Sequence, residues 1–459
     1  MSNSGDSDGF EDVVNFIKDI SWSELPPEAR RQAKLSTLDT LGAILAGTRT
    51  QISEIVSSVA EEVWPGDRST IFLKGRASEV GASFANGYTA NALDVDDGAK
   101  YTRGHPGAQI VPTALALAEY LHKPGKETIA AIVVGYEIAS RTGRCWHDSH
   151  ETYQACGSWG SVACAAVASK LYGLESDEIR QALGIAEYNA PNLPMMQAIE
   201  HPAMVKHGMG WGPMTGIIAA RLARKGFTGT PSILSSPGYE GWVEDIGSRY
   251  IMTEDNGVTY KEHASCGWGH PAMEAAHQLI NENEIAVDRI EKIWVKGFHE
   301  TVCLHIDHPS SEEEAQFSVA WPLASLLIYG EVGPDQMLED SLDDERVKDL
   351  VDRIELLESK ELNDMTSRTG RGEDRVGRWA ASVEVQLEDG RRLDSGITSV
   401  DLGSKNEWTV RKIEDKFRWL VEDVIGPSGT RETVEKVEDI DCLSSIRELT
   451  KLFAADRSN

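Results

Sequence analysis

Paired cysteines are missing from this sequence. Its 459 residues include six cysteines, and none of them forms a Cys-x-x-Cys pair. Structural zinc sites and iron–sulfur clusters need grouped thiolates, so the spacing supports neither. Scattered thiols are typical of a reducing compartment, and the polar start "MSNSGDSDGFEDVV" resembles neither a signal peptide nor a transit peptide. We therefore expect a cytoplasmic protein.

Basic residues are also scarce. There are 45 lysines and arginines against 74 aspartates and glutamates, which gives a net charge of −29. Nucleic acids and anionic membranes bind to basic surfaces, so neither is expected as a partner. No apolar run approaches the roughly 20 residues that cross a bilayer. The excess of acid favours solubility and would suit a cytoplasm rich in salt.

Several well-known catalytic motifs are absent. The chain has no glycine-rich nucleotide loop, no Gly-x-Ser-x-Gly elbow and no His-Glu-x-x-His motif. Without a redox or phosphate-binding motif, we expect chemistry that uses no metal and no organic cofactor. Acid and base groups of the chain itself would then act on a small anionic molecule.

Apolar periodicity predicts helices over the first 260 or so residues. "PPEARRQAKLSTLDTLGAILAG" starts with proline and stops at glycine, as helices do, and the Ala-rich "WGSVACAAVASKLYGL" predicts a helix buried on most sides. After about His263 the pattern changes. "RIEKIWVKGF" alternates like a strand, "WAASVEVQLEDGRRLDSGI" predicts a hairpin around Asp389-Gly390, and "SSEEEA" reads as an acidic loop.

The tail from "EWTVRKIEDKFRWLVEDVIG" onward returns to a helical pattern. We therefore predict a mainly α protein in which both chain ends, residues 1–262 and 403–459, build a large all-helical domain. A smaller α+β domain, residues 263–402, would be inserted between them.

The stretch "NALDVDDGAKYTRGHPG" gathers Asp94, Asp96, Asp97 and His105 just before an apolar helix. In an extended segment the first two aspartates share one face and Asp97 lies on the other. His105 directly precedes a helix N-terminus, a position that favours anions. The stretch is either a solvated loop with capping aspartates or one wall of an active site.

Two further stretches place basic groups beside glycines, which let a ligand approach the backbone. "MVKHGMGWGPMTG" carries Lys206 and His207, with a surface lysine as the plain alternative. "YKEHASCGWGHPAMEAA" carries Lys261, His263, Cys266 and His270. Cys266 is either a thiol nucleophile or, more simply, a buried structural cysteine. A metal site of His263, Cys266 and His270 is a further alternative, but these residues lack a familiar ligand spacing.

A fourth stretch, "ETYQACGSWG", offers Gln154, Ser158 and Trp159 ahead of the Ala-rich helix, and its plain alternative is helix capping. Four polar, glycine-rich stretches that each lead into a helix are together stronger support for an active site than any one of them.

These stretches, in this order, resemble the MmgE/PrpD family, which includes 2-methylcitrate dehydratase, cis-aconitate decarboxylase and iminodisuccinate epimerase. The resemblance covers nearly the whole chain. It rests on "LDTLGAILAG", "NALDVDDGAKYTRGHPGAQIVPTALALAEY", "WGSVACAAVASKLYGL", "KHGMGWGPMTGIIAARLARKGFTG", "YKEHASCGWGHPAMEAA" and "AQFSVAWPLASLLIYGEV".

The resemblance implies a large helical domain with an inserted α+β lid, a homodimer, and a cleft between domain and lid that holds no metal or organic cofactor. It points to four catalytic residues: Asp94, His105, Lys206 and Lys261. Further candidates for substrate contact are Arg103, Gln154, His207, Cys266, His270 and Trp321.

The chain departs from the family pattern at three positions. Gly98 stands where members tend to carry threonine, Gln154 where they tend to carry histidine, and Trp321 where tyrosine is frequent. Loss of the histidine removes one candidate acid or base and leaves His105 and the lysines to move protons.

The expected function is a lyase acting on a small di- or tricarboxylate, with a hydro-lyase like 2-methylcitrate dehydratase as the first choice. Lysines would stabilise the charge that develops on a substrate carboxylate, and a histidine would transfer the proton. The alternatives are a cis-aconitate decarboxylase-like enzyme, an iminodisuccinate epimerase-like enzyme, and a non-catalytic carboxylate-binding protein.

Overall fold

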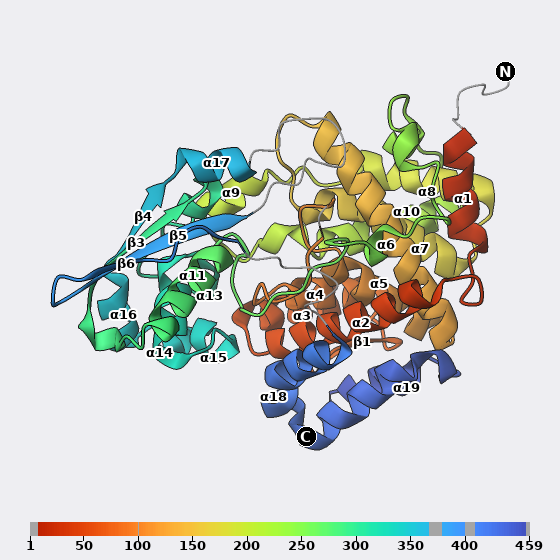
Figure 1. Cartoon of the computed structure of the whole chain (residues 1–459). Helices are drawn as coiled ribbons and strands as arrows, with labels where there is room; N and C mark the ends of the chain where they lie inside the picture. The colour runs from red at the N-terminus through yellow and green to blue at the C-terminus, as the bar shows by residue number, and fades with distance from the viewer. Residues whose placement is uncertain (1–7, 100, 367–378, 400–408, 456–459) are drawn as a thin grey trace.

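Helices dominate the computed structural model, which describes residues 8–99, 101–366, 379–399 and 409–455 (Figure 1). The helices before residue 263 are α1 (Asp8–Asp19), α2 (Pro27–Gly47), α3 (Gln51–Val63), α4 (Glu79–Ala90), α5 (Gly107–Leu121), α6 (Gly125–Ser149), α7 (Cys156–Tyr172), α8 (Ser176–Tyr188), α9 (Met195–Glu200) and α10 (Trp211–Ala223). The prediction of a mainly α fold is confirmed. A short antiparallel pair, β1 (Ser69–Ile71) and β2 (Gly75–Ala77), was not expected.

Small side chains bring the central helices close together. Helix α7 is buried along almost its whole length and packs against α5, α6, α8 and α10. A Cβ atom at Gly216 of α10 would lie 2.6 Å from the backbone nitrogen of Ala165, so only glycine fits there. This packing explains why the Ala-rich stretch reads as apolar on every side.

A small mixed sheet forms after residue 289. Its strands are β3 (Ile290–Gly297), β4 (Ile354–Glu358), β5 (Ala380–Leu387), β6 (Arg392–Asp394) and β7 (Thr398–Ser399). The order is β4-β3-β5-β6, with β3 and β4 parallel, the other neighbours antiparallel, and β7 paired with the start of β5. The predicted strand and hairpin are confirmed, and Gly390 takes the left-handed conformation, φ 84°, that a tight turn requires.

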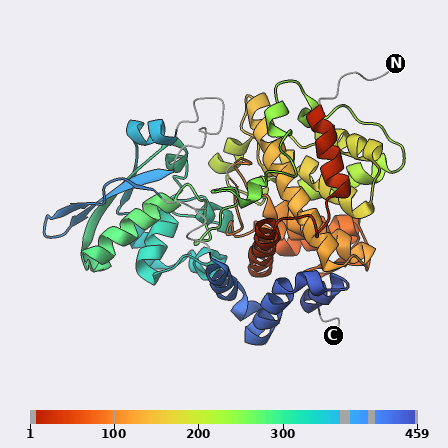
Figure 2. The same cartoon turned by 45° about the vertical axis from the view of Figure 1, so that its right-hand side comes forward.

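Further helices lie with this sheet, and Figures 1 and 2 both place the sheet to one side of the helical mass. They are α11 (His270–Glu282), α12 (His299–Val302), α13 (Glu312–Gln316), α14 (Ala320–Tyr329), α15 (Pro334–Met337), α16 (Glu345–Val351) and α17 (Lys360–Thr366). Helix α13 corrects the prediction of a loop over "SSEEEA". Ser311 caps it by accepting a hydrogen bond from the Glu314 backbone, and its glutamates fill the first turn, where acids are favourable.

The tail returns to the N-terminal helices. Helix α18 (Val410–Glu438) packs against α2, with the Phe417 ring against Gly42, and α19 (Arg447–Thr450) follows. The C-terminal helix α18 therefore packs directly on the N-terminal helices. The predicted boundary at residues 402 and 403 lies outside the described residues. Among the helices that the structure describes, none is long and apolar enough to cross a membrane.

Lys416 of α18 is a buried cation at this junction. Its Nζ donates to Asp39 Oδ1 of α2 at 2.5 Å and to the Val95 carbonyl at 2.7 Å. Its side chain is 5% exposed and that of Asp39 is fully buried. Burial raises the pKa of Asp39, and Lys416 opposes this rise. Helix α18 thus fixes the acidic stretch through the hydrogen bond from Lys416 to the Val95 carbonyl.

We predict that Lys416→Met lowers the free energy of unfolding by about 3 kcal/mol, because it leaves a buried carboxylate unpaired. Urea unfolding followed by circular dichroism measures the change. Lys412→Met, one turn away in an exposed pair with Glu262, is the matched control and should cost under about 1 kcal/mol. Adding Asp39→Asn to Lys416→Met should recover part of the loss. An equal effect of the two single variants would contradict the assignment.

Candidate active site

The acidic stretch divides its three carboxylates between two faces. Asp94 takes a left-handed backbone, φ 50°, so the segment is not extended. Even so, Asp94 Oδ1 lies 3.4 Å from His105 Nε2, and Asp96 Oδ2 lies 3.3 Å from His105 Nδ1. Asp97 points elsewhere, accepting hydrogen bonds from the Tyr136 hydroxyl at 2.6 Å and the Gly107 amide at 2.9 Å. Asp94 and Asp96 therefore face His105 together and Asp97 faces away, as expected, although the segment is not extended.

The contacts of His105 determine which nitrogen carries its hydrogen. Nδ1 lies 2.7 Å from the Asp97 carbonyl and also faces Asp96. Both partners are acceptors, so Nδ1 donates and Nε2 is the nitrogen free to exchange a proton. Burial lowers the pKa of His105, but the Asp96 and Asp94 carboxylates together outweigh burial, and the pKa is raised above its ordinary value.

Lys261 and Asp94 form a buried ion pair. Lys261 Nζ lies 2.9 Å from Asp94 Oδ1 and donates to the carbonyls of Asp94 at 2.7 Å and Ser265 at 3.2 Å. Burial lowers the pKa of Lys261, but Asp94 and then Asp96 outweigh it and raise the pKa. Burial likewise opposes ionisation of Asp94, but Lys261 and then His105 hold its pKa below the usual range. Both groups are therefore charged at neutral pH.

Lys206 and His207 lie on a strained turn, with φ values of 34° and 55° in the left-handed region. Lys206 Nζ donates to Gln316 Oε1 at 2.6 Å, and its pKa is lowered by burial. The His207 ring stacks on His105 with centroids 5.7 Å apart and planes 8° apart. Burial, and then the charge of His105, lower the pKa of His207 to about 3, so this imidazole is neutral.

The structure thus brings Asp94, His105, Lys206 and Lys261 together from segments far apart in sequence. Lys206 also acts on Asp94, where it helps lower the pKa. One potential metal-ligand atom from each of Asp94, His105 and His207 lies within 4.8 Å of the other two. The ammonium group of Lys261 already neutralises that carboxylate, and a second ammonium lies nearby, so the arrangement favours an anion over a cation.

Arg103 and Gln154, two other sequence candidates, each take part in a hydrogen bond that involves a backbone group. The Arg103 carbonyl accepts a hydrogen bond from the Tyr153 hydroxyl. Gln154 Oε1 accepts from the Leu193 amide at 2.7 Å and so fixes the loop ahead of α7. From the same stretch it is Cys156 that touches the site, because its thiol accepts from the His105 amide at 3.3 Å.

Of the remaining candidates, Cys266 and His270 lie near Lys261, and Trp321 lies elsewhere. Burial, and then Asp94, raise the pKa of the Cys266 thiol to about 12, which argues against a thiol nucleophile. His270 opens α11 and contacts Ser265, the residue whose carbonyl holds Lys261. Trp321 does not join these contacts. It is buried in the core, and its indole donates to the Gln336 carbonyl at 3.2 Å.

Besides Cys156, three residues that sequence reasoning did not select lie against the site. Gln316 binds Lys206, and its motif "AQFS" had carried part of the family resemblance. Tyr136 binds Asp97, and burial helps raise the pKa of that carboxyl to about 8. Lys416 holds the Val95 carbonyl. Neither Tyr136 nor Lys416 carries a sequence signal that separates it from an ordinary helix residue.

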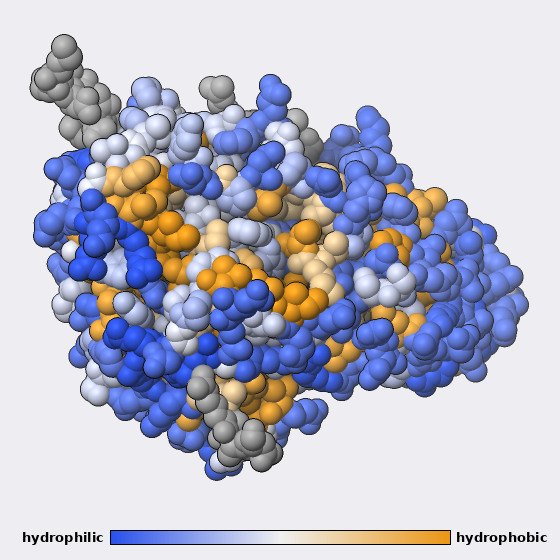
Figure 3. All heavy atoms as spheres, turned by 180° about the vertical axis from the view of Figure 1, so that it is seen from behind, coloured by the Kyte–Doolittle hydropathy of each residue, from blue (hydrophilic) through white to orange (hydrophobic). Residues whose placement is uncertain are grey.

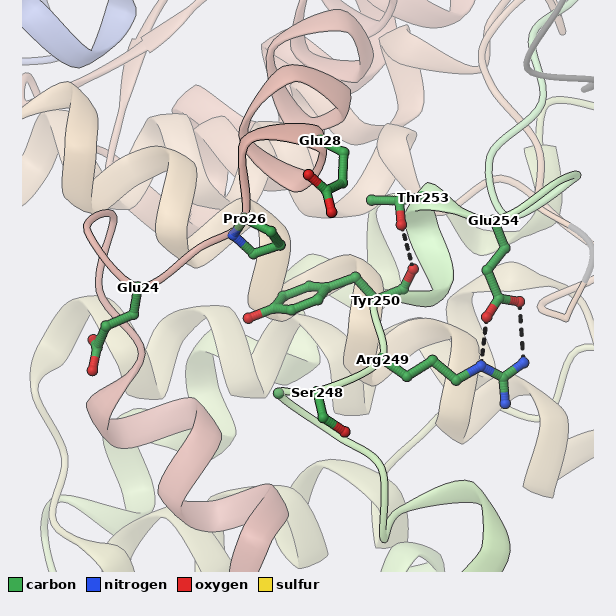
Figure 4. Close-up of a pocket in the computed structure, with 9 residues that line it drawn as sticks. Glu24, Pro26, Glu28, Ser248, Arg249, Tyr250, Thr253 and Glu254 are labelled. Carbon is green, nitrogen blue, oxygen red and sulfur yellow. Dashed lines mark hydrogen bonds and ion pairs between the residues drawn. The ribbon is translucent and has the colours of Figure 1, made fainter.

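A separate surface pocket of about 400 Å³ contains none of these groups (Figure 4). Arg249 lies in it but is paired with Glu254 and Asp245. Its other lining residues are Glu24, Pro26, Glu28, Gly247, Ser248, Tyr250, Thr253 and Glu254. With its cation neutralised and three carboxylates around it, this pocket is poorly suited to an anion.

The fold and the site together define a mainly helical protein with a buried, lysine-rich site. Family comparison is more specific. The MmgE/PrpD N-terminal domain matches residues 11–248 and the MmgE/PrpD C-terminal domain matches residues 263–441. The chain belongs to the MmgE/PrpD family, which confirms the resemblance seen in the sequence.

Similar proteins are known from fungi and animals. The chain is 25% identical to a cis-aconitate decarboxylase-like protein, oryM, of Aspergillus oryzae, over 97% of each chain. It is 24% identical to a cis-aconitate decarboxylase of Aspergillus terreus, over 96% of this chain and 95% of the relative. A cis-aconitate decarboxylase of Homo sapiens is 26% identical over 75% of this chain and 76% of its own.

Proposed function

We propose that the protein is a lyase that acts on a small di- or tricarboxylate with its own side chains and no cofactor. The observation that carries this proposal is the Lys261–Asp94–His105 arrangement, with distances of 2.9 and 3.4 Å at one carboxylate oxygen. It places the Nε2 nitrogen of His105 and a fixed ammonium group at the same carboxylate oxygen. Family membership and relatives named as cis-aconitate decarboxylases support the same class of reaction.

His105 is the proposed proton-transfer group. Its Nδ1–H is bound to the Asp97 carbonyl, so Nε2 faces the space beside Asp94 in a defined tautomer. Loss of either water or carbon dioxide from a polycarboxylate requires a proton to leave or join a carbon next to a carboxylate. Lys261 would stabilise the negative charge that develops on that carboxylate, and Asp94 would keep Lys261 in place.

The leaving group separates the two candidate reactions. Dehydration was the first expectation from the sequence, and decarboxylation is the activity named for the relatives. Gln154 holds a loop through the Leu193 amide, which makes it a structural replacement at the position where the family tends to carry histidine. Because decarboxylation is the activity named for the relatives, we propose decarboxylation of a cis-aconitate-like acid as the reaction to test first.

The test is a substrate panel of cis-aconitate, 2-methylcitrate and citrate in deuterated water, followed by proton NMR. We expect one acid to be converted, with carbon dioxide loss and water loss giving different vinyl signals. Deuterium uptake without a new product would indicate an epimerase instead. Binding without conversion or exchange of any acid would leave a carboxylate-binding protein and refute the lyase.

The inserted unit and the oligomer complete the proposal. We propose that the sheet-containing unit acts as a lid over the site, because Gln316 of α13 reaches Lys206 from that unit. Figure 3 shows apolar patches on the face of the molecule that it draws. Separately, Ile55, Val59 and Val63 are exposed at one-turn spacing on α3. Such surface supports a homodimer, which light scattering on the purified chain would test.

A further inference from the structure

Two buried polar groups beside Lys206 have no hydrogen-bond partner within the described part of the chain. They are the Gln316 amide nitrogen Nε2 and the His207 ring nitrogen Nδ1. Gln316 is fully buried and His207 is 3% exposed. Buried polar groups in folded proteins are nearly always bonded. Gln316 contacts Lys206 and His207 follows Lys206 in the chain, so a ligand with acceptor atoms at Lys206 would supply the missing partners.

The orientation of the Gln316 amide follows from its neighbour. Lys206 Nζ can only donate, and it lies 2.6 Å from Oε1, so the oxygen faces the lysine and the NH₂ group points elsewhere. Both hydrogens of that NH₂ group are then available to an acceptor. Lys206 itself spends one of its three hydrogens on Gln316 and adds a positive charge.

The end of α13 is held firmly against the site. The Gln316 carbonyl accepts from the Cys266 amide at 2.9 Å, on the loop that carries Lys261. The neighbouring Phe317 ring lies edge-on to His207 at 5.6 Å and under Lys206 Nζ at 5.1 Å. The amide therefore belongs to the same rigid environment as Lys206 and His207.

We propose that Gln316, Lys206 and His207 form a subsite for one carboxylate of the substrate, apart from the group handled by Asp94, His105 and Lys261. A carboxylate has two oxygens and accepts several hydrogen bonds, which matches the ammonium and amide donors here. His207 is neutral and can add one N–H donor through Nδ1. The substrate class is then an acid with at least two carboxylates, one for each ammonium group. This inference rests on the proposed function, because it concerns the same site.

The decisive variant is Gln316→Glu. Its carboxylate still accepts from Lys206, so a purely structural anchor would be preserved. It removes the two amide donors and repels an anion. Titration calorimetry with propane-1,2,3-tricarboxylate, which has no hydroxyl or double bond to react, measures the affinity. We expect the affinity to fall at least about tenfold, while the midpoint of thermal unfolding is unchanged or raised.

Gln278→Glu is the matched control, because it adds the same charge at an exposed position on α11. It should leave the affinity within about twofold of the original chain, since an exposed charge is screened by salt. Equal affinity of the Gln316→Glu variant and the original chain would overturn the subsite and leave the lyase intact. Binding with no turnover of any acid would refute the lyase and keep the subsite. Failure of the original chain to bind propane-1,2,3-tricarboxylate or citrate would overturn both.

Discussion

Replacing His105 by asparagine should lower kcat by about 10²- to 10⁴-fold, the usual contribution of a positioned acid or base. The asparagine amide can still donate to the Asp97 carbonyl from near the position of Nδ1, so the loop keeps its hydrogen bond. It offers no group that titrates near neutrality at the position of Nε2. The loss should therefore appear in kcat, with little change in the affinity for the acid.

Steady-state kinetics on the converted acid measure this loss, and His150→Asn, at the exposed end of α6, is the control. The pH profile supplies a second readout. Asp96 raises the pKa of His105 above the ordinary histidine value of 6.5. If the neutral imidazole is the active form, the midpoint of the acid limb of kcat/KM should therefore lie above pH 6.5. Asp96→Asn should move that limb to lower pH. Unchanged turnover in His105→Asn, or a limb that moves upward, would remove His105 as the proton-transfer group.

Replacing Lys261 by methionine should reduce kcat/KM by about 10²- to 10³-fold, because a fixed charge aimed at the developing anion is lost. It should also lower the free energy of unfolding by about 3 kcal/mol, because Asp94 is left as a buried carboxylate without its closest cation. Kinetics and urea unfolding measure the two effects separately.

The double variant Lys261→Met with Asp94→Asn separates chemistry from stability. Removing the orphaned charge should restore much of the stability, since both members of the pair are then neutral. Turnover should stay low, because the ammonium group is still missing. Recovery of turnover together with stability would show that Lys261 serves only to neutralise Asp94. Lys292→Met, on the exposed side of β3, should change neither quantity.

Local sequence signals were sufficient for the fold where one segment determines its own structure. Proline and glycine limits predicted α2, and the Asp-Gly turn predicted the hairpin of β5 and β6. The short helix α13 was missed because three consecutive glutamates read as solvated loop. Its stability comes from the Ser311 cap and from the acids in its first turn, both of which depend on the exact helix start.

The site residues were predictable where their neighbours in the sequence form an unusual pattern, such as clustered polar residues or adjacent glycines. Asp94 and His105 lie in a dense polar stretch, and Lys206 and Lys261 lie beside glycines. Gln316 and Lys416 gave no such sign, because each becomes important only through a partner 110 or 321 residues away. The left-handed backbone of Asp94 was also hidden, since aspartate more often adopts ordinary conformations.

The return of α18 onto α2 has a consequence for how the protein is made. During synthesis Asp39 and the Val95 carbonyl leave the ribosome early, while Lys416, which binds both, emerges more than 300 residues later. Until then the nascent chain must carry an uncompensated carboxylate in its future interior. The hydrogen bonds that Lys416 gives to Asp39 and to the Val95 carbonyl can therefore form only after most of the chain has been translated.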